Sequence, residues 1–427
     1  MRMRLSLASS ASVIAAAALT TLITLAANTH ARPLVNLDPT DAQAPFEASS
    51  NSGAGAWWDH HSVVGGAADS LTIWGRLTRD DNYAMLVRVL EFEQDTIALL
   101  DDPDAQITLF APSNDALRGG GLNPSAPSTL PDLAAALSAP GAHVHRARWK
   151  NLAHNLLRYH IVPSPAPLSA IARNSTLPTA LKPFDGSGAG IARRIHVEHS
   201  LVPLRPALRV NWWAKVVSSA PATNGYLHTL DQALVPPSSV FEEMFLVSRY
   251  LSTTTTAIQR AGLDLGWEDG EGEPLVTAFA PSNDAWNALP ADLHYFLFSR
   301  KGNKALKKLL KYHTAPGVLL LSEVVAGAEA EGEVKADGTF KRVVELESGS
   351  GEQLQVTLEK ARLLPINGAV KTSVKINGVK ARLIDVPATN GAWHMIDKVL
   401  VPPARGASPR GGWADWQLWL DDWASSA

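Results

Sequence analysis

Three short segments of this 427-residue chain occur twice, in the same order, and this internal repeat constrains the fold more than any other feature. Because loops accept changes of length that helices and strands do not, collinear matches with slightly unequal spacing indicate one duplicated domain with loop insertions. One insertion is evident at 119–141, where Gly, Pro and Ser cluster. The repeated pairs are Ile107–Ala116 with Val276–Ala285, Leu156–His160 with Leu309–His313, and Pro221–Pro237 with Pro387–Pro403.

The composition is typical of a folded, modular protein that does not bind nucleic acid. A chain of this length exceeds one ordinary hydrophobic core and predicts about two or three domains. Hydrophobic residues make up 46% and charged residues 19%, a balance too apolar for a disordered chain. The net charge is -3, from 38 basic and 41 acidic residues, so no overall positive field attracts DNA, RNA or an anionic membrane.

Residues 1–31 have the form of a secretory signal peptide. Arg2 and Arg4 precede an apolar stretch at 11–27, and small residues follow it. This stretch is close to the length of a membrane-spanning helix, so an uncleaved anchor is the alternative to cleavage. Residues 32–69 are expected to form a flexible linker. The chain has no Cys, which excludes disulfides, thiolate metal sites and Cys-based catalysis.

Each copy begins with a helical pattern that leads into a buried strand. Apolar residues recur near helical spacing over 85–100 in the first copy and 244–258 in the second. Short apolar runs at 107–110 and 275–279, rich in β-formers and closed by Pro, predict buried strands. In the Pro-Ser-Asn-Asp-Ala segment that follows each run, Ser or Asn can cap the next helix and Asp lies in its first turn.

The second half of each copy changes from helical to strand patterns. A Tyr-His pair ends one further helix in each copy, predicted over 149–159 and 304–312. Helices first and strands later within one unit indicate an α+β fold. Alternating apolar and polar residues predict half-exposed strands at 342–346, 354–358 and 374–376, and Asn-Gly turns are expected at 224–225, 377–378 and 390–391.

These segments resemble the fasciclin-like domain family. Thr-x-Phe-Ala-Pro-Ser-Asn-Asp-Ala is similar to its first signature, the Tyr-His pair to its central one, and Asn-Gly-x-x-His-x-Ile-Asp-x-Val-Leu-x-Pro to its last. All three occur twice, which implies two tandem fasciclin-like modules at 70–237 and 238–403, each a β-sheet wedge flanked by helices. The copies are unequal, because Asp385 of the second module is replaced by Ser219 in the first.

The resemblance implies a function without catalysis. We expect a cell-adhesion or extracellular-matrix and cell-wall interaction protein, with no cofactor and with a protein or glycan of the surface, wall or matrix as partner. Its expected location is the secretory pathway, ending outside the cell or at its surface. Fungal proteins of similar arrangement include vacuolar ones, so the alternative is a vacuole-lumen or endomembrane protein that supports membrane trafficking or fusion. In that alternative the uncleaved N-terminal segment provides the membrane contact.

Two sets of polar residues are candidate binding residues. The Tyr-His region of animal family members is linked to integrin contact, which makes Tyr159-His160 and Tyr312-His313 candidates by resemblance. The competing interpretation is structural, since Tyr and His at the end of an amphipathic helix commonly anchor it to the core. Asp385 and His394 of the second module are further candidates, although His228 and His394 most simply satisfy buried backbone carbonyls.

Catalytic and metal sites are not expected. No Gly-x-Ser-x-Gly elbow, phosphate loop or His-Glu-x-x-His helix occurs. The weak metal candidates are Asp59-His60-His61 and His143-Val144-His145. Asn174-Ser175-Thr176 is a glycosylation sequon, so Asn174 is expected to carry a glycan.

The segment at 404–427 is a Trp-rich tail. Four Trp residues and Leu420 share one face of a helical wheel, and Asp415, Asp421 and Asp422 lie on the other. An acidic face does not suit anionic lipid, which favours Lys and Arg. The tail is therefore expected to form an amphipathic helix that docks on its own second module, with a partner surface as the alternative.

Overall fold

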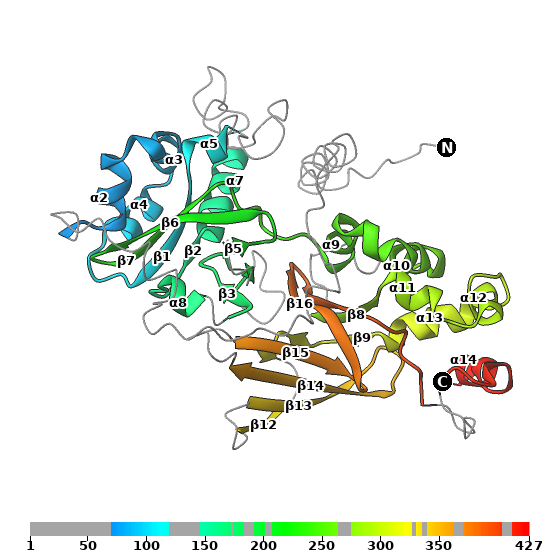
Figure 1. Cartoon of the computed structure of the whole chain (residues 1–427). Coiled ribbons are helices and arrows are strands. Elements are labelled where there is room, and N and C mark those ends of the chain that lie inside the picture. The colour runs from blue at the N-terminus through cyan, green and yellow to red at the C-terminus, as the bar shows by residue number, and fades with distance from the viewer. Residues whose placement is uncertain are drawn as a thin grey trace, which may run out of the picture. The chain divides into compact units, whose positions relative to one another are not determined.

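The computed structural model describes residues 70–118, 146–171, 174–182, 192–200, 207–263, 275–326, 330–334, 340–362, 370–403 and 412–426 (Figure 1). The signal segment, the linker, the insertion at 119–141 and both weak metal candidates lie outside these residues. Among the helices described, none is long and apolar enough to cross a bilayer.

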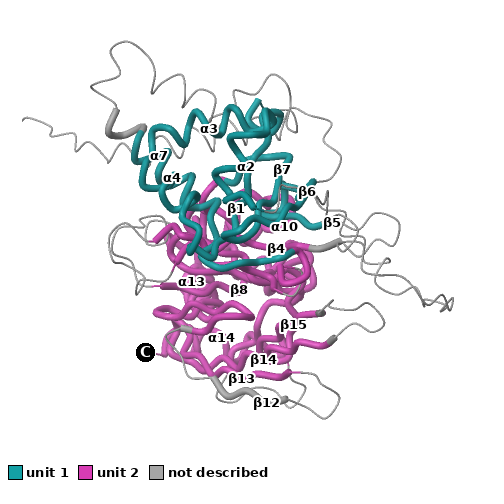
Figure 2. The backbone as a smooth tube through the Cα atoms, turned by 90° about the vertical axis from the view of Figure 1, so that its left-hand side faces the viewer, with its two compact units in different colours: residues 1–167, 199–234 teal, residues 168–198, 235–427 magenta. Residues whose placement is uncertain are grey.

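The chain divides into two compact units (Figure 2). The first unit comprises residues 1–167 and 199–234, and the second comprises 168–198 and 235–427. Residues 168–198 thus pack with the second unit, although in the sequence they lie within the first repeat. This division follows packing in space, and the repeat limits drawn from the sequence stay a prediction.

The first unit carries its helices before most of its strands. Its helical elements are α2 (Ile73–Arg79), η3 (Asp81–Tyr83), α3 (Ala84–Leu90), α4 (Gln94–Asp101), α5 (Asn114–Leu117) and α7 (Arg146–Tyr159). Its strands are β1 (Ile107–Pro112), β2 (Ile161–Val162), β5 (Ala207–Val210), β6 (Ala214–Ala222) and β7 (Gly225–Leu230), which lie in the order β2-β1-β7-β6-β5. The helix expected over 85–100 is in fact two helices, α3 and α4, because the chain turns between Leu90 and Gln94.

The second unit repeats this arrangement with more strands. Its helices are α8 (Leu168–Ile171), α9 (Val240–Leu246), α10 (Ser248–Ala261), α11 (Asn283–Asn287), α12 (Ala291–Leu297), α13 (Asn303–Tyr312), η6 (Trp416–Leu418) and α14 (Leu420–Ser425). The strands β3 (Thr176–Pro178) and β4 (Arg194–Ser200) pair antiparallel, and β10 (Leu319–Leu320) and β11 (Val325–Ala326) form a two-stranded sheet.

The main sheet of the second unit has eight strands in the order β12-β13-β14-β15-β16-β17-β8-β9. The strands are β8 (Val276–Pro281), β9 (Thr314–Pro316), β12 (Ala330–Val334), β13 (Phe340–Glu347), β14 (Gln353–Arg362), β15 (Val370–Ile376), β16 (Val379–Ala388) and β17 (Gly391–Ile396). The strands expected from alternation at 342–346, 354–358 and 374–376 are β13, β14 and β15, so these predictions are confirmed. So is the Asn377-Gly378 turn, whose φ values of 47° and 80° suit a tight hairpin.

Both units are built on the same parallel strand pair. In the first unit Phe110 of β1 lies opposite His228 of β7, and in the second Phe279 of β8 lies opposite His394 of β17. A helix follows the first strand of each pair, and the side chain of Ser113 or Ser282 caps it over 3.1 Å. The strand-to-helix junction and the α+β fold class expected from the sequence are therefore confirmed.

The Trp-rich tail packs on the second unit, as expected. Its core-facing side chains, Trp416, Trp419, Leu420 and Trp423, are buried, while its three Asp residues are exposed. The tail is not one continuous helix, however. Asp415 has a φ of 53°, and a single 3-10 turn, η6, precedes the short helix α14.

Candidate functional site

The Tyr-His pairs occupy equivalent hydrogen-bond frames in the two units. Nδ1 of His160 donates to the carbonyl of Leu156 over 2.7 Å, and its Nε2 accepts from the backbone N–H of Leu234 over 2.9 Å. In the second unit His313 does the same with Leu309 and Leu400, over 2.8 and 2.9 Å. Each imidazole therefore joins the end of a helix to the segment after the last strand. Both ring nitrogens are used in the neutral state.

The Tyr hydroxyls have matching partners as well. The side-chain amide of Asn211 donates to the Tyr159 hydroxyl over 2.8 Å, and that of Asn377 donates to the Tyr312 hydroxyl over 2.9 Å. Both Asn residues have a left-handed φ, 49° and 47°. The Tyr side chains thus fix two strained turns, and the structural interpretation of the Tyr-His pairs is the one that these contacts support.

The histidines of the final strands also bond to backbone. Nε2 of His228 donates to the carbonyl of Ala166 over 2.8 Å, and Nε2 of His394 donates to that of Leu320 over 3.0 Å. The sequence-based expectation that these side chains satisfy buried carbonyls is confirmed. Burial lowers the pKa of His160, His228 and His313 to about 4, and it lowers the pKa of His394 as well.

All six candidate binding residues are buried. Tyr159, Asp385 and His394 are 0% exposed, and the other three are at most 3% exposed. Direct contact with a partner requires exposure, which these side chains do not have in this structure. Their assignment as binding residues stays a prediction, and their contacts place them in the support of the fold. The remaining three are His160, Tyr312 and His313.

Asp385 lies at the centre of a polar cluster that the sequence did not reveal. Its Oδ1 accepts from the backbone N–H of Ser322 over 2.8 Å, and its Oδ2 accepts from the hydroxyls of Ser322 and Ser175. Its backbone carbonyl accepts from Nδ1 of His196 over 3.0 Å. Asp385 has a φ of 60°, in a bulge where β16 shifts register against β17. The bulge turns the carboxylate into the interior.

Glu323 supplies the second carboxylate of this cluster. It accepts from the Ser175 backbone and hydroxyl over 2.8 and 2.7 Å and from Lys360 over 3.2 Å. Burial alone raises the pKa of Glu323, but the Lys360 ammonium and the Ser175 bonds outweigh it and hold the pKa below its ordinary value. The Arg194 side chain donates to Thr176 over 2.9 Å within the field of both carboxylates. The two carboxylates of the cluster are therefore balanced in charge by two cationic side chains, Lys360 and Arg194.

The glycosylation sequon is part of the same cluster. Asn174 is partly exposed, and its side-chain amide donates to the carbonyl of Ala170 over 3.3 Å. Ser175 and Thr176 bond to Glu323. No contact here decides whether Asn174 carries a glycan, so glycosylation stays a prediction. The sequence could not place Ser175, Ser322 and Glu323 together, because they come from distant loops; the one available signal was Asp385 itself, through its absence from the first copy.

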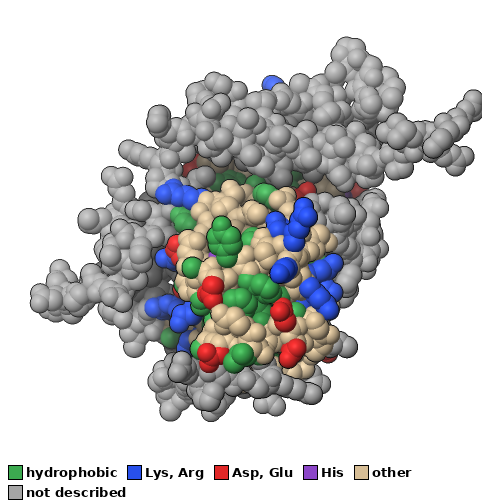
Figure 3. Space-filling view, turned by 90° about the vertical axis from the view of Figure 1, so that its right-hand side faces the viewer, with side chains coloured by type: hydrophobic (Ala, Val, Ile, Leu, Met, Phe, Trp, Pro, Cys, Tyr) green, Lys and Arg blue, Asp and Glu red, His purple; other side chains and the backbone are tan. Residues whose placement is uncertain are grey.

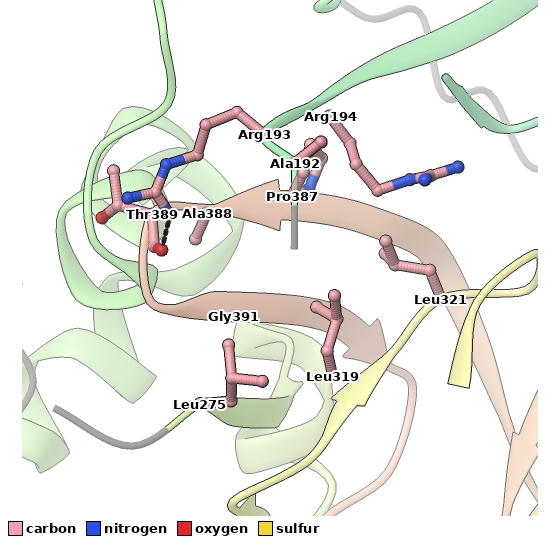
Figure 4. A pocket seen from close by; sticks show the side chains of 10 residues that line it. All are labelled: Ala192, Arg193, Arg194, Leu275, Leu319, Leu321, Pro387, Ala388, Thr389 and Gly391. Atoms are coloured by element: carbon pink, nitrogen blue, oxygen red, sulfur yellow. Dashed lines mark hydrogen bonds between the residues drawn. The ribbon is translucent and has the colours of Figure 1, made fainter. Parts of the chain in front are cut away.

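A small cavity adjoins the cluster (Figure 4). Leu275, Leu319 and Leu321 form its apolar side, and Arg193 and Arg194 border it from the strand opposite. The Arg193 guanidinium donates to the carbonyl of Thr389, at the turn between β16 and β17. The space open to water-sized molecules is about 20 Å³, which is room for one water. The cavity does not have the size of a cofactor or sugar site.

The described part of the second unit offers no catalytic arrangement around this cluster. The Ser175 and Ser322 hydroxyls bond to carboxylates, whereas an activated serine needs a base that takes its proton. The Nδ1 of His394 accepts from the backbone N–H of Asp385, so this ring does not face a serine. Within the described residues no group of three His, Asp or Glu could hold a metal ion. The geometry is that of a structural ion-pair network.

Comparison with known protein families gives two matches along the chain. The Fasciclin domain model matches residues 81–236 and 249–402, which together exceed half of the chain. The chain belongs to the fasciclin domain family. The resemblance drawn from its three repeated signatures is thereby confirmed.

Relatives of this fasciclin protein cover it to different extents. Aurofusarin biosynthesis cluster protein S of Gibberella zeae is 24% identical over 356 residues, covering 81% of this chain and 80% of that protein. Transforming growth factor-beta-induced protein ig-h3 of Sus scrofa is 30% identical over 187 residues, but these are 44% of this chain and 23% of ig-h3. A solved FAS1 domain pair from the insect cell adhesion molecule Fasciclin I covers 74% of this chain and 97% of that one, at 17% identity and a TM-score of 0.32.

Fasciclin domains are found in adhesion and matrix proteins, among which are ig-h3 and periostin. Homologues that contain fasciclin domains are mostly secreted or cell-surface proteins. For this chain, these relatives support an adhesion-type role outside the cell. The particular partner and compartment are matters of proposal.

Proposed function

We infer that this chain is a non-catalytic adhesion protein of the cell surface, cell wall or extracellular matrix. The observation that carries the inference is the use made of its repeated polar residues. In both fasciclin domains the Tyr and His side chains of the signatures are buried in hydrogen bonds that hold the fold. Binding is therefore assigned to exposed loops and surfaces of the domains, where a protein or glycan partner has access.

The charge pattern of the surface supports such a role. Hydrophobic, basic and acidic side chains are interspersed on the face shown in Figure 3. Tyr295 and Leu418 of the second unit are 84% and 80% exposed. Exposed aromatic side chains of this kind contribute strongly to protein and sugar contacts.

A sedimentation assay tests the proposed function. The purified chain is mixed with insoluble chitin, β-glucan or mannan, or with beads that carry surface proteins, and the bound fraction is measured over a range of protein concentrations. We expect saturable retention by at least one of these materials. The Tyr295→Ala variant is the surface test, and Tyr312→Phe, which changes a buried hydroxyl, is its matched control. Retention by none of the materials, or turnover of a glycan or ester by the pure protein, would contradict the proposal.

The compartment needs a separate experiment. The apolar stretch at 11–27 is close to the length of a membrane-spanning helix, so the alternative to cleavage is that the N-terminal segment stays attached. It would then hold the protein in a vacuole or endomembrane lumen, where it supports trafficking or fusion. N-terminal sequencing of the mature chain distinguishes the two. A start after Ala27 or Ala31 removes the anchor, whereas a start at Met1 together with a membrane-bound fraction contradicts secretion.

A second candidate function comes from the relative that matches along four-fifths of both chains, a biosynthesis cluster protein. This match favours a role beside biosynthetic enzymes, in which the fasciclin domains gather them outside the cell. Deletion of the gene followed by metabolite profiling tests it. An unchanged metabolite profile in the deletion strain would contradict this second function and leave adhesion as the proposed role.

A further inference from the structure

The Trp-rich tail lies outside the fasciclin domain to which it is attached. The family match of the second domain ends at 402, whereas the tail described here spans 412–426. The sheet and helices of the domain are formed before the tail begins, because β17 ends at Ile396. The tail therefore resembles a ligand of the domain more than one of its elements.

The surface that receives the tail, here called the tail seat, is formed by α12, α13 and Glu352. Figure 1 shows α12, α13 and α14 on one side of the second unit. Asp292 of α12 accepts from the indole N–H of Trp416 over 3.2 Å, and Phe296 lies against the same indole, with ring centroids 5.0 Å apart. The Trp416 end of the tail is thus held by one carboxylate and one aromatic ring.

The Trp423 end is held by a second set of contacts. Its indole N–H donates to Glu352 over 2.6 Å, and the Tyr312 ring meets it edge to face at 6.4 Å. The Lys308 ammonium lies 4.9 Å from the centre of the same ring. Lys308 also donates to the carbonyls of Trp423 and Ser426, over 2.8 and 2.9 Å. Lys308 therefore binds the end of α14 in two ways, through the Trp423 indole and through the free carbonyls of the last helical turn.

The composition of the seat is that of a docking surface. Indole anchors surrounded by charged groups are typical of binding hot spots, whereas the core of a domain is almost free of charge. Lys308 and Glu352 form an ion pair over 3.8 Å within the seat itself, without the tail as a partner.

The tail and its seat belong to one chain, with eight residues, 404–411, between the domain and the tail. Covalent attachment makes the docking of a chain's own tail an intramolecular event, with which a second copy must compete. A second copy competes only when chains are crowded, as they are on a surface to which an adhesion protein is attached.

We propose that the tail seat is a homotypic docking site, which takes the C-terminal segment of a second copy of this chain in place of its own. The occupant is argued from the chain itself, because the segment that fits the seat is carried by every copy. Exchange of identical segments forms a dimer without any new contact, which makes it a low-cost route to association. The proposal goes beyond the adhesion function and does not depend on which wall or matrix partner the domains bind.

Complementation between two full-length variants tests the proposal. Trp423→Ala weakens the tail and leaves its seat intact, whereas Lys308→Ala weakens the seat and leaves its tail intact. We expect each variant alone to be monomeric by light scattering, and an equimolar mixture to form a dimer. In the matched control, Lys307→Ala, at an exposed neighbour on the same helix, takes the place of Lys308→Ala in the mixture with Trp423→Ala. This control mixture should form less of the mixed dimer. A mixture that stays monomeric at the highest soluble concentration overturns the proposal.

A second measurement avoids the risk that a variant fails to fold. A protease site is inserted between Gly406 and Ala407, and the folded full-length chain is cleaved there. We expect a fluorescent peptide of residues 412–426 to replace the cleaved tail, and the same peptide with Trp423→Ala to bind at least about tenfold more weakly. Unfolding on cleavage, seen in circular dichroism, or a folded chain that never takes up the peptide, overturns the idea that the tail is exchangeable.

Discussion

The backbone N–H of Asp385 donates to Nδ1 of His394 over 3.1 Å, and this bond distinguishes the second fasciclin domain from the first. In the first domain Ser219 lies opposite the equivalent His228, whose Nδ1 has no hydrogen-bond partner among the described residues. The same histidine therefore has both nitrogens satisfied in one copy and only one in the other. Asp385 lies in a register shift of β16 with a left-handed φ of 60°, whereas Ser219 pairs with His228 after the register shift of β6.

Replacement of Asp385 should destabilise the second domain. Asp385→Ala removes the acceptor of the buried Ser322 N–H and the short bonds that the Ser322 and Ser175 hydroxyls donate to the carboxylate, at a cost of about 3 kcal/mol in the free energy of unfolding. Urea denaturation of the full chain, followed by tryptophan fluorescence, measures the loss. Ser219→Ala at the equivalent position of the first domain is the control and should cost under about 1 kcal/mol. Equal effects at the two positions would contradict the role assigned to the cluster.

The sequence predicted the parts of this fold that local chemistry determines. Period-two strands, Ser caps and Asn-Gly turns follow from neighbouring residues, and the duplication revealed which of them belong to both domains. The Asp385 cluster escaped prediction because Ser175 and Glu323 meet only after the chain has folded, 148 positions apart. The packing of residues 168–198 with the second unit has the same explanation. The tail was predicted correctly as docked, but the left-handed Asp415 that divides it carries no signal in a helical wheel.

Acid should destabilise both domains through their buried histidines. The folded-state pKa of about 4 for His160, His228 and His313 lies below the ordinary 6.5, so the unfolded chain takes up protons that the folded chain rejects. The stability that the neutral imidazoles contribute should be fully present above pH 6.5. The free energy of unfolding should then fall as pH drops toward 4, by up to about 1.4 kcal/mol per pH unit for each ring. Thermal melts at half-unit pH steps measure this loss.

Glu243 provides the control for the pH experiment, since it acts in the opposite direction. Burial raises its pKa to about 7, so its contribution to stability is present at low pH and is lost as pH rises from about 4.5 to 7. Glu243→Gln should therefore make the acid loss steeper. A flat profile between pH 7 and pH 4.5 in both proteins would show that the imidazoles are protonated without cost, contrary to their burial.

The Tyr-Asn pairs should be equivalent in the two domains. Tyr159→Phe and Tyr312→Phe each remove the acceptor of one Asn amide, and we expect a loss of about 1 kcal/mol in either case. Asn377→Ala should cost more than Tyr312→Phe, because it also removes the bond from the Gln355 N–H over 2.8 Å and places Ala at a left-handed φ. Equilibrium unfolding of the three variants measures the order. An Asn377→Ala loss no larger than that of Tyr312→Phe would contradict the role of the turn.

The glycine that opens the last strand of the second domain should not tolerate any side chain. A Cβ on Gly391 would lie 1.8 Å from the carbonyl oxygen of Val276, on the parallel neighbour strand, and Gly391 has a φ of 149°. Gly391→Ala must push β17 away from β8, so we expect a loss of several kcal/mol or failure to fold. Gly351→Ala separates the two causes, because Gly351 has a φ of 89° with nothing within 4 Å of its Cβ position, and should cost only about 1 kcal/mol of backbone strain. Soluble yield and unfolding midpoints of the two variants measure these losses. Similar losses would mean that the parallel strands accommodate the methyl group and that backbone strain alone sets the preference for glycine.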